Sequence, residues 1–223
     1  MIWMKLIEIQ KNIEKILDSN LERYQEEGLD RFNNDKWTNL TWKSDKFRRA
    51  HIDVVDARDT KKLWMMHVCI FPSIKSGAPI YGFDIIAGEK KVTGAFHDFS
   101  IVDHNHSSKY KFKEFVSQTK WKKERELPEW AKAIFSENML AAGNLQEENE
   151  IEQLSNLVLA TTKWYIEEMP VLEGYIDYDA TAAQNRYAHF QKQNPHTPRT
   201  MKSLGLNEDD VDVFVSKCLF PEL

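Results

Sequence analysis

The chain has 223 residues, a net charge of −5 and an ordinary globular composition, with 42% hydrophobic and 29% charged residues. Its length suits one domain with a substantial core, although length alone would also permit two. No apolar run reaches the roughly 18 residues that span a bilayer, and the acidic balance argues against a dedicated nucleic-acid binder. The N-terminal segment MIWMKLIEIQKNIEKI is interrupted by charges, unlike a secretory signal, so we expect a cytoplasmic protein.

The expected elements fall into three blocks along the chain. Apolar residues recur near helical spacing over residues 5–27, where Gly28 is expected to end a helix. Strand-like segments with short turns follow at 36–44, 46–56, 62–72, 78–88 and 90–100. Helical patterns return at 109–119, 129–140, 147–168, 179–192 and 207–218. Short connections favour antiparallel neighbours, so we predict an α/β fold: a three-layer α/β/α sandwich around one antiparallel sheet, with residues 1–223 in a single domain.

Four titratable residues lie on strand segments that otherwise have the pattern of buried sheet. By strand alternation, His51 and Asp53 share one face of the segment 46–56, while His67 and Asp84 lie on the next two segments. The register between strands is not readable from sequence, so a common site and separate local environments both stay open. Buried titratable groups that cluster favour a functional site, and burial should raise the pKa of Asp84.

Three other features of the sequence could mark a site. Residues 97–106, HDFSIVDHNH, match no zinc or iron spacing, so we expect no metal. Residues 109–125 carry seven basic side chains against two glutamates, and in an acidic chain a solvated helix face or a dock for an acidic protein is favoured over a nucleic-acid surface. Cys69 and Cys218 lack any CxxC partner and are expected to be small buried hydrophobes, not a disulfide.

Four blocks, in order, resemble the ferredoxin-dependent bilin reductase family. YGFDIIAG (81–88) resembles the family's Phe-Gly-x-Asp-Ile-Val-Ala-Gly strand, and HVCIFP (67–72) matches its His-x-x-x-Phe-Pro strand at the same 17-residue interval. FRRAH (47–51) resembles an Arg-x-x-His strand, and RELPEWAKAIFSE (125–137) an Arg-Glu-Leu-Pro-x-Trp block. The resemblance covers about residues 45–140 and resumes weakly near 193–199.

The resemblance implies an oxidoreductase with a bilin pocket between the sheet and the C-terminal helices. Such enzymes reduce the open-chain tetrapyrrole biliverdin IXα through radical steps, with single electrons from a [2Fe–2S] ferredoxin and without a bound cofactor of their own. The resemblance therefore implies biliverdin and ferredoxin as partners, no nucleic acid or membrane, and a monomer. A pocket of this kind needs positioned acids, because each bilin radical must be protonated at a defined carbon.

Site residues are carried over position by position. Asp84 resembles the central proton donor, His67 its partner, and His51 the histidine beneath the D-ring side of the bilin. The resemblance also places three residues at the substrate: Asn194, Ile86 and Phe71. A ferredoxin is strongly acidic, so the basic stretch becomes its expected dock, with these residues: Lys109, Lys111, Lys113, Lys120, Lys122 and Lys123.

Asp53 bears on the product. The pair of His67 and Asp84 is typical of the phycocyanobilin-forming branch, which has a glutamate where this chain has Asp53. One methylene less shortens the reach by about an ångström, enough to cost roughly 100-fold in a positioned step. Some phage-encoded relatives of that branch form phycoerythrobilin through 15,16-dihydrobiliverdin, and we expect that product. Phycocyanobilin through reduction of the 18-vinyl group, a non-catalytic bilin carrier, and an interaction module that binds an acidic partner stay open as alternatives.

Overall fold

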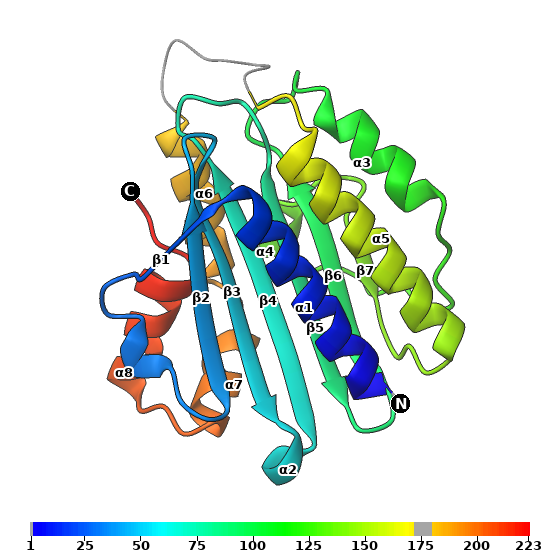
Figure 1. Ribbon diagram of the computed structural model, residues 1–223, viewed down its shortest axis with the longest axis vertical. Coiled ribbons are helices and arrows are strands. Elements are labelled where there is room, and N and C mark those ends of the chain that lie inside the picture. The colour runs from blue at the N-terminus through cyan, green and yellow to red at the C-terminus, as the bar shows by residue number, and fades with distance from the viewer. Residues whose placement is uncertain (1, 172–179) are drawn as a thin grey trace.

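The computed structural model describes residues 2–171 and 180–223, and its centre is an antiparallel sheet (Figure 1). The strands are β1 (Glu22–Tyr24), β2 (Trp37–Lys43), β3 (Phe47–Ala57), β4 (Leu63–Pro72), β5 (Ile80–Gly88), β6 (Val92–Ser100) and β7 (Leu140–Ala142). They lie in the sheet in the order of the sequence, and each pairs antiparallel with the next. The predicted meander is therefore confirmed.

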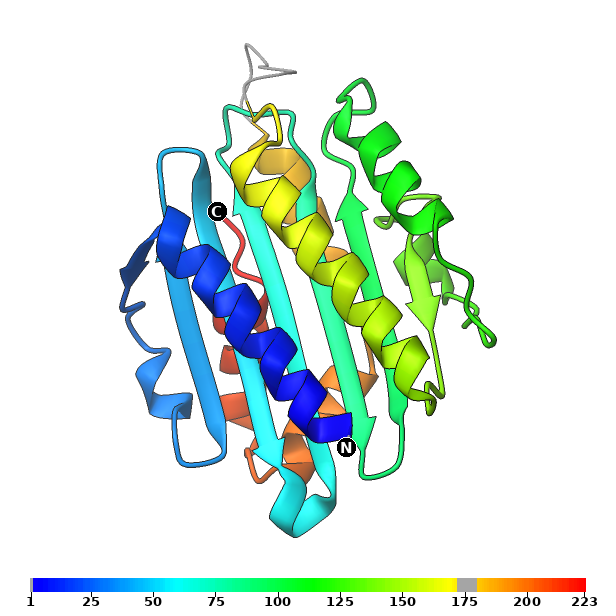
Figure 2. The same cartoon turned by 45° about the vertical axis from the view of Figure 1, so that its right-hand side comes forward.

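Helices cover both faces of this sheet (Figures 1 and 2). One face carries α1 (Ile2–Asn20), α3 (Ser108–Ser117) and α5 (Glu148–Glu167). The other face carries α6 (Thr181–Gln191), α7 (His196–Ser203), α8 (Glu208–Val213) and the π-helical turn η2 (Phe214–Leu219). Short helical turns complete the fold: η1 (Asp30–Phe32), α2 (Arg58–Lys61) and α4 (Glu129–Lys132). The predicted α/β/α sandwich is confirmed, and we call the face under α6–η2 the C-terminal face.

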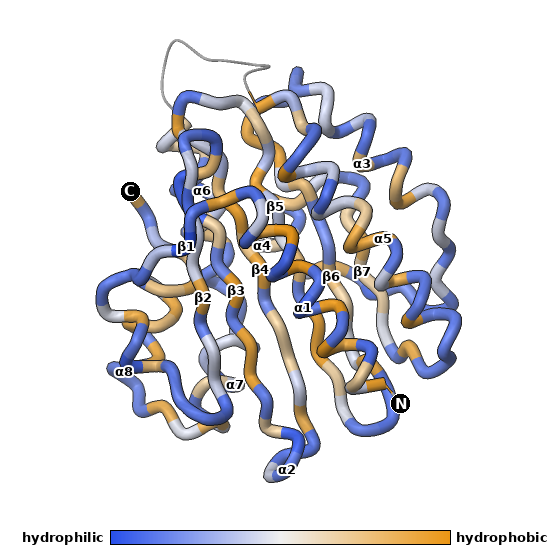
Figure 3. Tube along the Cα trace, viewed as in Figure 1, coloured by the Kyte–Doolittle hydropathy of each residue, from blue (hydrophilic) through white to orange (hydrophobic). Residues whose placement is uncertain are grey.

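The alternation of each strand divides the buried side chains between two cores. On β3 and β4, Ile52 and Val68 point towards α1 and α5, whereas Cys69 and Phe71 belong to the core under the C-terminal helices. Helix α1 buries apolar residues at helical spacing and exposes charged ones, an alternation visible along its trace in Figure 3. Most side chains on both faces of the central strands are thus buried, so a polar group there lies in a largely apolar setting.

Two element boundaries and one additional helix differ from the sequence expectation. The helix predicted over 5–27 ends at Asn20, because residues 22–24 pair with β2 as an edge strand. The prediction of a helix over 129–140 is wrong after Lys132, where α4 ends, and residues 140–142 pair with β6 as a strand. The helix α7 was not predicted. The predicted start at residue 179 lies outside the described residues.

Two further expectations can be compared with the structure directly. Cys69 and Cys218 are both buried and free, as predicted. Among the helices of residues 2–171 and 180–223, none combines the length and the apolar character needed to cross a membrane.

Candidate active site

A row of titratable side chains crosses three central strands on the C-terminal face. The register places Asp53 of β3 opposite His67 of β4, and His67 opposite Asp84 of β5. Directly opposed residues point to the same side of a sheet, and neighbouring strands are about 4.8 Å apart. His51 lies two residues along β3 from Asp53 and therefore on the same face. The structure thus brings together the four residues whose common location the sequence left open.

Aromatic residues of α6 and of the segment after η2 pack over this face of the sheet. The ring of Phe220 meets the ring of His67 edge-on, with centroids 5.4 Å apart. The ring of Tyr187 on α6 meets that of Phe71 in the same way, with centroids 6.0 Å apart. A Cβ atom added at Gly82 would lie 3.3 Å from the Tyr187 hydroxyl, so α6 approaches the β5 backbone closely. The row therefore lies between the sheet and the C-terminal helices, where the resemblance places the bilin. Two surface grooves, of about 520 and 400 Å³, border neither His67 nor Asp84; the second is lined in part by Asn39, the partner of His51.

Asp84 combines partial burial with a carboxyl group that no described residue engages in a hydrogen bond or ion pair. Burial raises its pKa to about 7, and the nearby charge of Asp53 adds to this rise. The raised pKa expected from sequence is confirmed. A carboxylic acid with a pKa near neutrality holds a proton at working pH and can still give it up, which is the requirement for a general acid.

Asp53 is more deeply enclosed, with 1% of its surface exposed. Its carboxyl group accepts a hydrogen bond from the indole N–H of Trp37 on β2. Burial raises the pKa of Asp53 to about 7, and the bond from Trp37 opposes this rise. Two carboxyl groups that hold protons near neutral pH therefore flank one histidine.

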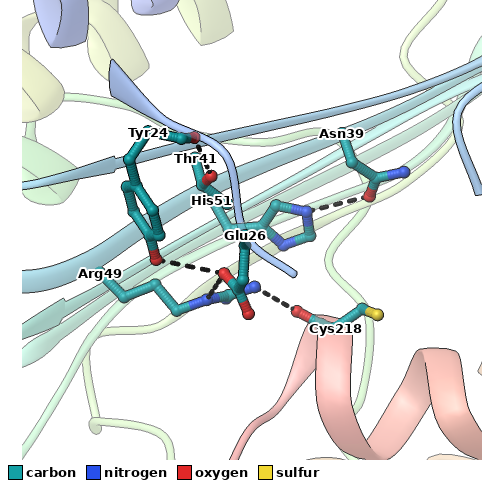
Figure 4. Close-up of polar contacts among 7 residues, drawn as sticks. All are labelled: Tyr24, Glu26, Asn39, Thr41, Arg49, His51 and Cys218. Atoms are coloured by element: carbon teal, nitrogen blue, oxygen red, sulfur yellow. Dashed lines mark hydrogen bonds and ion pairs between the residues drawn. The ribbon is translucent and has the colours of Figure 1, made fainter. Parts of the chain in front are cut away.

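Burial favours the neutral form of both histidines of the row. Burial lowers the pKa of His67 to about 3 and that of His51 well below its usual value, and the charge of Arg49 acts in the same direction. The Nε2 atom of His51 is 3.0 Å from Oδ1 of Asn39 (Figure 4). The amide nitrogen of Asn39 donates a second bond to Asn33, which orients the amide group. His51 therefore donates from Nε2.

The remaining ring nitrogens of these histidines are unsatisfied. The Nδ1 atoms of His51 and His67 are buried and have no hydrogen-bond partner within the described residues. The two ring centroids lie 6.4 Å apart. Buried polar atoms without partners are rare and call for an explanation, such as a catalytic or binding role. The row thus offers two acidic carboxyls and two imidazoles on the same face of the sheet.

Two of the three predicted substrate residues lie on the face that carries the row, and the third lies in a turn. Phe71 is buried on the C-terminal face, and Ile86, 36% exposed, lies on this face opposite Met65. Asn194 lies between α6 and α7, and its side-chain oxygen accepts from the backbone N–H of His196 at 3.0 Å. That bond belongs to the turn before α7, and no bond within the described residues joins Asn194 to the row.

The predicted docking lysines lie on α3 and the loop after it. Helix α3 lies on the same side of the sheet as α5 (Figure 2), with the ring of Phe112 stacked on that of Phe99 at 4.5 Å. The lysines and the row therefore occupy opposite faces of the sheet. Lys111 pairs with Glu114 at 2.9 Å and Lys122 with Glu147. The stretch is thus partly neutralised by carboxylates of its own chain.

The segment 97–106 contributes to packing on both sides of the sheet. His97 contacts Thr161 of α5 at 2.8 Å, whereas the next residue, Asp98, accepts hydrogen bonds from Ser100 and Ser136 on the C-terminal face. Among residues 2–171 and 180–223, no three His, Cys, Asp or Glu side chains gather as a potential metal site.

The sequence reasoning missed several neighbours of the row. Trp37 and Asn39 hold Asp53 and His51, and alternation within KWTNLTWKS could have placed both on the same face of a strand. Tyr187 and Phe220 carried no comparable signal, because they reach the row from segments more than 100 residues away in the sequence.

Comparison with known proteins identifies the family of this chain. The family model described as ferredoxin-dependent bilin reductase matches residues 6–221. The chain belongs to the ferredoxin-dependent bilin reductase family. The resemblance inferred from four sequence blocks is thereby confirmed, and the protein is an oxidoreductase of a family that uses ferredoxin.

Several relatives and solved structures are similar to this member of the family. A phycocyanobilin:ferredoxin oxidoreductase of Prochlorococcus marinus is 26% identical over 188 residues, which cover 80% of this chain and 74% of the relative. One of Trichodesmium erythraeum is 24% identical, with 82% and 75% covered. The solved structure of PcyX is 38% identical to this chain and has a TM-score of 0.72. The alignment covers 98% of this chain and 99% of the PcyX chain. Phytochromobilin synthase from tomato, in complex with biliverdin, shares the fold at 14% identity, with a TM-score of 0.77 and coverage of 98% and 82%.

Proposed function

We propose that this protein reduces biliverdin IXα to phycoerythrobilin by way of 15,16-dihydrobiliverdin. Four electrons arrive one at a time from reduced [2Fe–2S] ferredoxin, and four protons accompany them. The first two electrons and two protons reduce the double bond of the 15,16 bridge. The remaining two electrons and two protons add to the A-ring diene. The observation that carries the proposal is the row of Asp53, His67 and Asp84, because a bilin radical needs acids at fixed positions.

Asp84 is the proposed proton donor. Its carboxyl group is the one in the row that is partly exposed and free of bonds to described residues, so it can reach a pigment bound under the C-terminal helices. With a pKa raised to about 7 by burial, it is protonated in a large fraction of molecules at neutral pH. His67 lies beside it as a neutral imidazole that can accept or donate a hydrogen bond to the pigment or to Asp84.

The proposal includes the docking of ferredoxin on the basic stretch of residues 109–125, with one chain of a single domain acting as a cytoplasmic monomer. Acidic ferredoxin would be steered by the positive charge of this stretch. Because the stretch and the row occupy opposite faces, electrons from that position would cross the sheet or pass around its β6–β7 edge.

An anaerobic turnover of biliverdin IXα with reduced ferredoxin tests the function. We expect phycoerythrobilin, with 15,16-dihydrobiliverdin as an intermediate, identified by chromatography against bilin standards. Phycocyanobilin as the product would retain the reductase and overturn the assignment of the product. Pigment binding without consumption would identify a carrier instead.

The replacement Asp53→Glu tests the basis of product choice. Asp53 is tied to Trp37 and is one methylene shorter than the glutamate of the phycocyanobilin-forming branch, so we expect the longer side chain to divert part of the product to phycocyanobilin. The product ratio after complete turnover is the measurement. Asp56→Glu is the matched control, since Asp56 lies on the same strand and pairs with Arg58 instead. An active Asp53→Glu enzyme with unchanged products would rule out this role for Asp53.

A further inference from the structure

A β-bulge at the start of β3 brings two consecutive arginines to the C-terminal face. The register with β4 shifts between Phe47 and Arg49, which leaves Arg48 outside the ladder. Arg49 lies opposite Phe71, and the guanidinium of Arg48 lies 4.2 Å above the ring of the same Phe71. Bulges re-aim side chains in this way and are frequent beside active sites.

The structure gives these two guanidinium groups one carboxylate counter-ion within the described residues, and it pairs with Arg49 alone. Arg49, 3% exposed, pairs with Glu26 at 2.7 Å and donates to the backbone oxygen of Cys218 at 2.6 Å (Figure 4). Arg48 donates to the neutral amide of Gln184 at 2.6 Å, and within the described residues no carboxylate pairs with it. Burial lowers the pKa of Arg48 to about 10, and the charge of Arg49 contributes to this shift. The pair therefore holds one positive charge in excess at a site largely closed to water.

Each guanidinium also keeps a buried donor without an acceptor. Nη2 of Arg48 and Nη1 of Arg49 have no hydrogen-bond partner among the described residues. An unsatisfied buried donor costs free energy, more so when it is charged. Paired guanidinium groups with free N–H donors and excess positive charge suit a carboxylate, which accepts two parallel hydrogen bonds and neutralises the charge.

We propose that Arg48 and Arg49 form a carboxylate subsite for one propionate side chain of the bilin. This inference rests on the proposed function. Arg49 and Phe71 lie four residues along the strands from the level of His67, roughly 13 Å at 3.3 Å per residue. A propionate extends from the edge of the tetrapyrrole, and the arginine side chains are long, so together they cover this distance. The excess positive charge of the arginine pair then binds the propionate and thereby orients the pigment over Asp84.

The substitution Arg48→Gln tests the subsite. Binding of biliverdin IXα and of its dimethyl ester, which lacks both carboxylates, is measured by absorbance titration without ferredoxin. We expect the variant to bind biliverdin roughly 10- to 100-fold more weakly, the range for a lost charge-assisted hydrogen bond. Affinity for the dimethyl ester should stay the same. The melting temperature measures separately what the fold loses with the bond to Gln184 and the contact with Phe71.

The matched control is Arg58→Gln, the same change on an arginine at the opposite end of β3 that pairs with Asp56. It should leave both affinities unchanged. Equal weakening for both pigments in Arg48→Gln would overturn the subsite and leave this arginine a packing role on Phe71. If wild-type protein binds biliverdin but the variant binds it equally well, the subsite fails while the proposed function stands. If wild-type protein binds neither pigment, the proposed function itself fails, and the subsite with it.

Discussion

Replacing Asp84 by asparagine should stop the reduction of biliverdin while leaving the pigment bound. Asparagine has nearly the same shape as aspartic acid, but its amide is not an acid that can give a proton to a bilin radical. General acids at such positions contribute about 10²- to 10⁴-fold to a rate, and we expect a loss in this range. Single-turnover reduction by pre-reduced ferredoxin, followed by absorbance, measures it, and a titration without ferredoxin reports binding.

Asp98→Asn provides a matched control for this substitution. Asp98 lies on the same face of the sheet, and burial raises its pKa to about 6, but Ser100 and Ser136 already occupy its carboxyl group. We expect this variant to lose stability and to keep most of its turnover, the reverse of Asp84→Asn. A rate above a tenth of wild type in Asp84→Asn would exclude Asp84 as the proton donor. A bilin carrier would show no turnover even in the wild-type protein.

Strand alternation made it possible to predict the central strands and the face on which each titratable residue lies. Alternation assigns each residue of a long strand to one face, so His51 and Asp53 had to point the same way once 46–56 was read as a strand. The register that aligns Asp53, His67 and Asp84 was not predictable, because it depends on how each turn closes, and a slip by one residue reverses every side chain.

Short elements and long-range contacts explain most of what was missed. The strands β1 and β7 have three residues each, too few to show alternation, and pairing with a neighbour overrides the helical pattern around them. The contact of Phe220 with His67 joins residues 153 positions apart, and nothing local marks either residue for the other. The bulge at Arg48 likewise depends on pairing with β4, which the residues FRRAH alone do not indicate.

Replacing Asp53 by asparagine should stabilise the protein in mildly alkaline solution and have a much smaller effect in mildly acidic solution. Burial raises the pKa of Asp53 from its ordinary 3.8 to about 7. Between these values the unfolded chain has released a proton that the folded protein still holds, so the free energy of unfolding falls as pH rises. At about 1.4 kcal/mol per pKa unit, wild-type protein should lose roughly 2–3 kcal/mol from this group between pH 5 and pH 8.

Denaturant unfolding of wild type and Asp53→Asn at pH 5 and pH 8 measures this difference. Asp56→Asn is the control with the opposite sign: the hydrogen bond from Arg58 lowers the pKa of Asp56, so its loss should destabilise the protein similarly at both pH values. Parallel pH dependence for wild type and Asp53→Asn would mean that Asp53 is ionised throughout this range. A gain of stability at pH 8 that accompanies a loss of turnover would show that the buried acid is kept for chemistry at the expense of the fold.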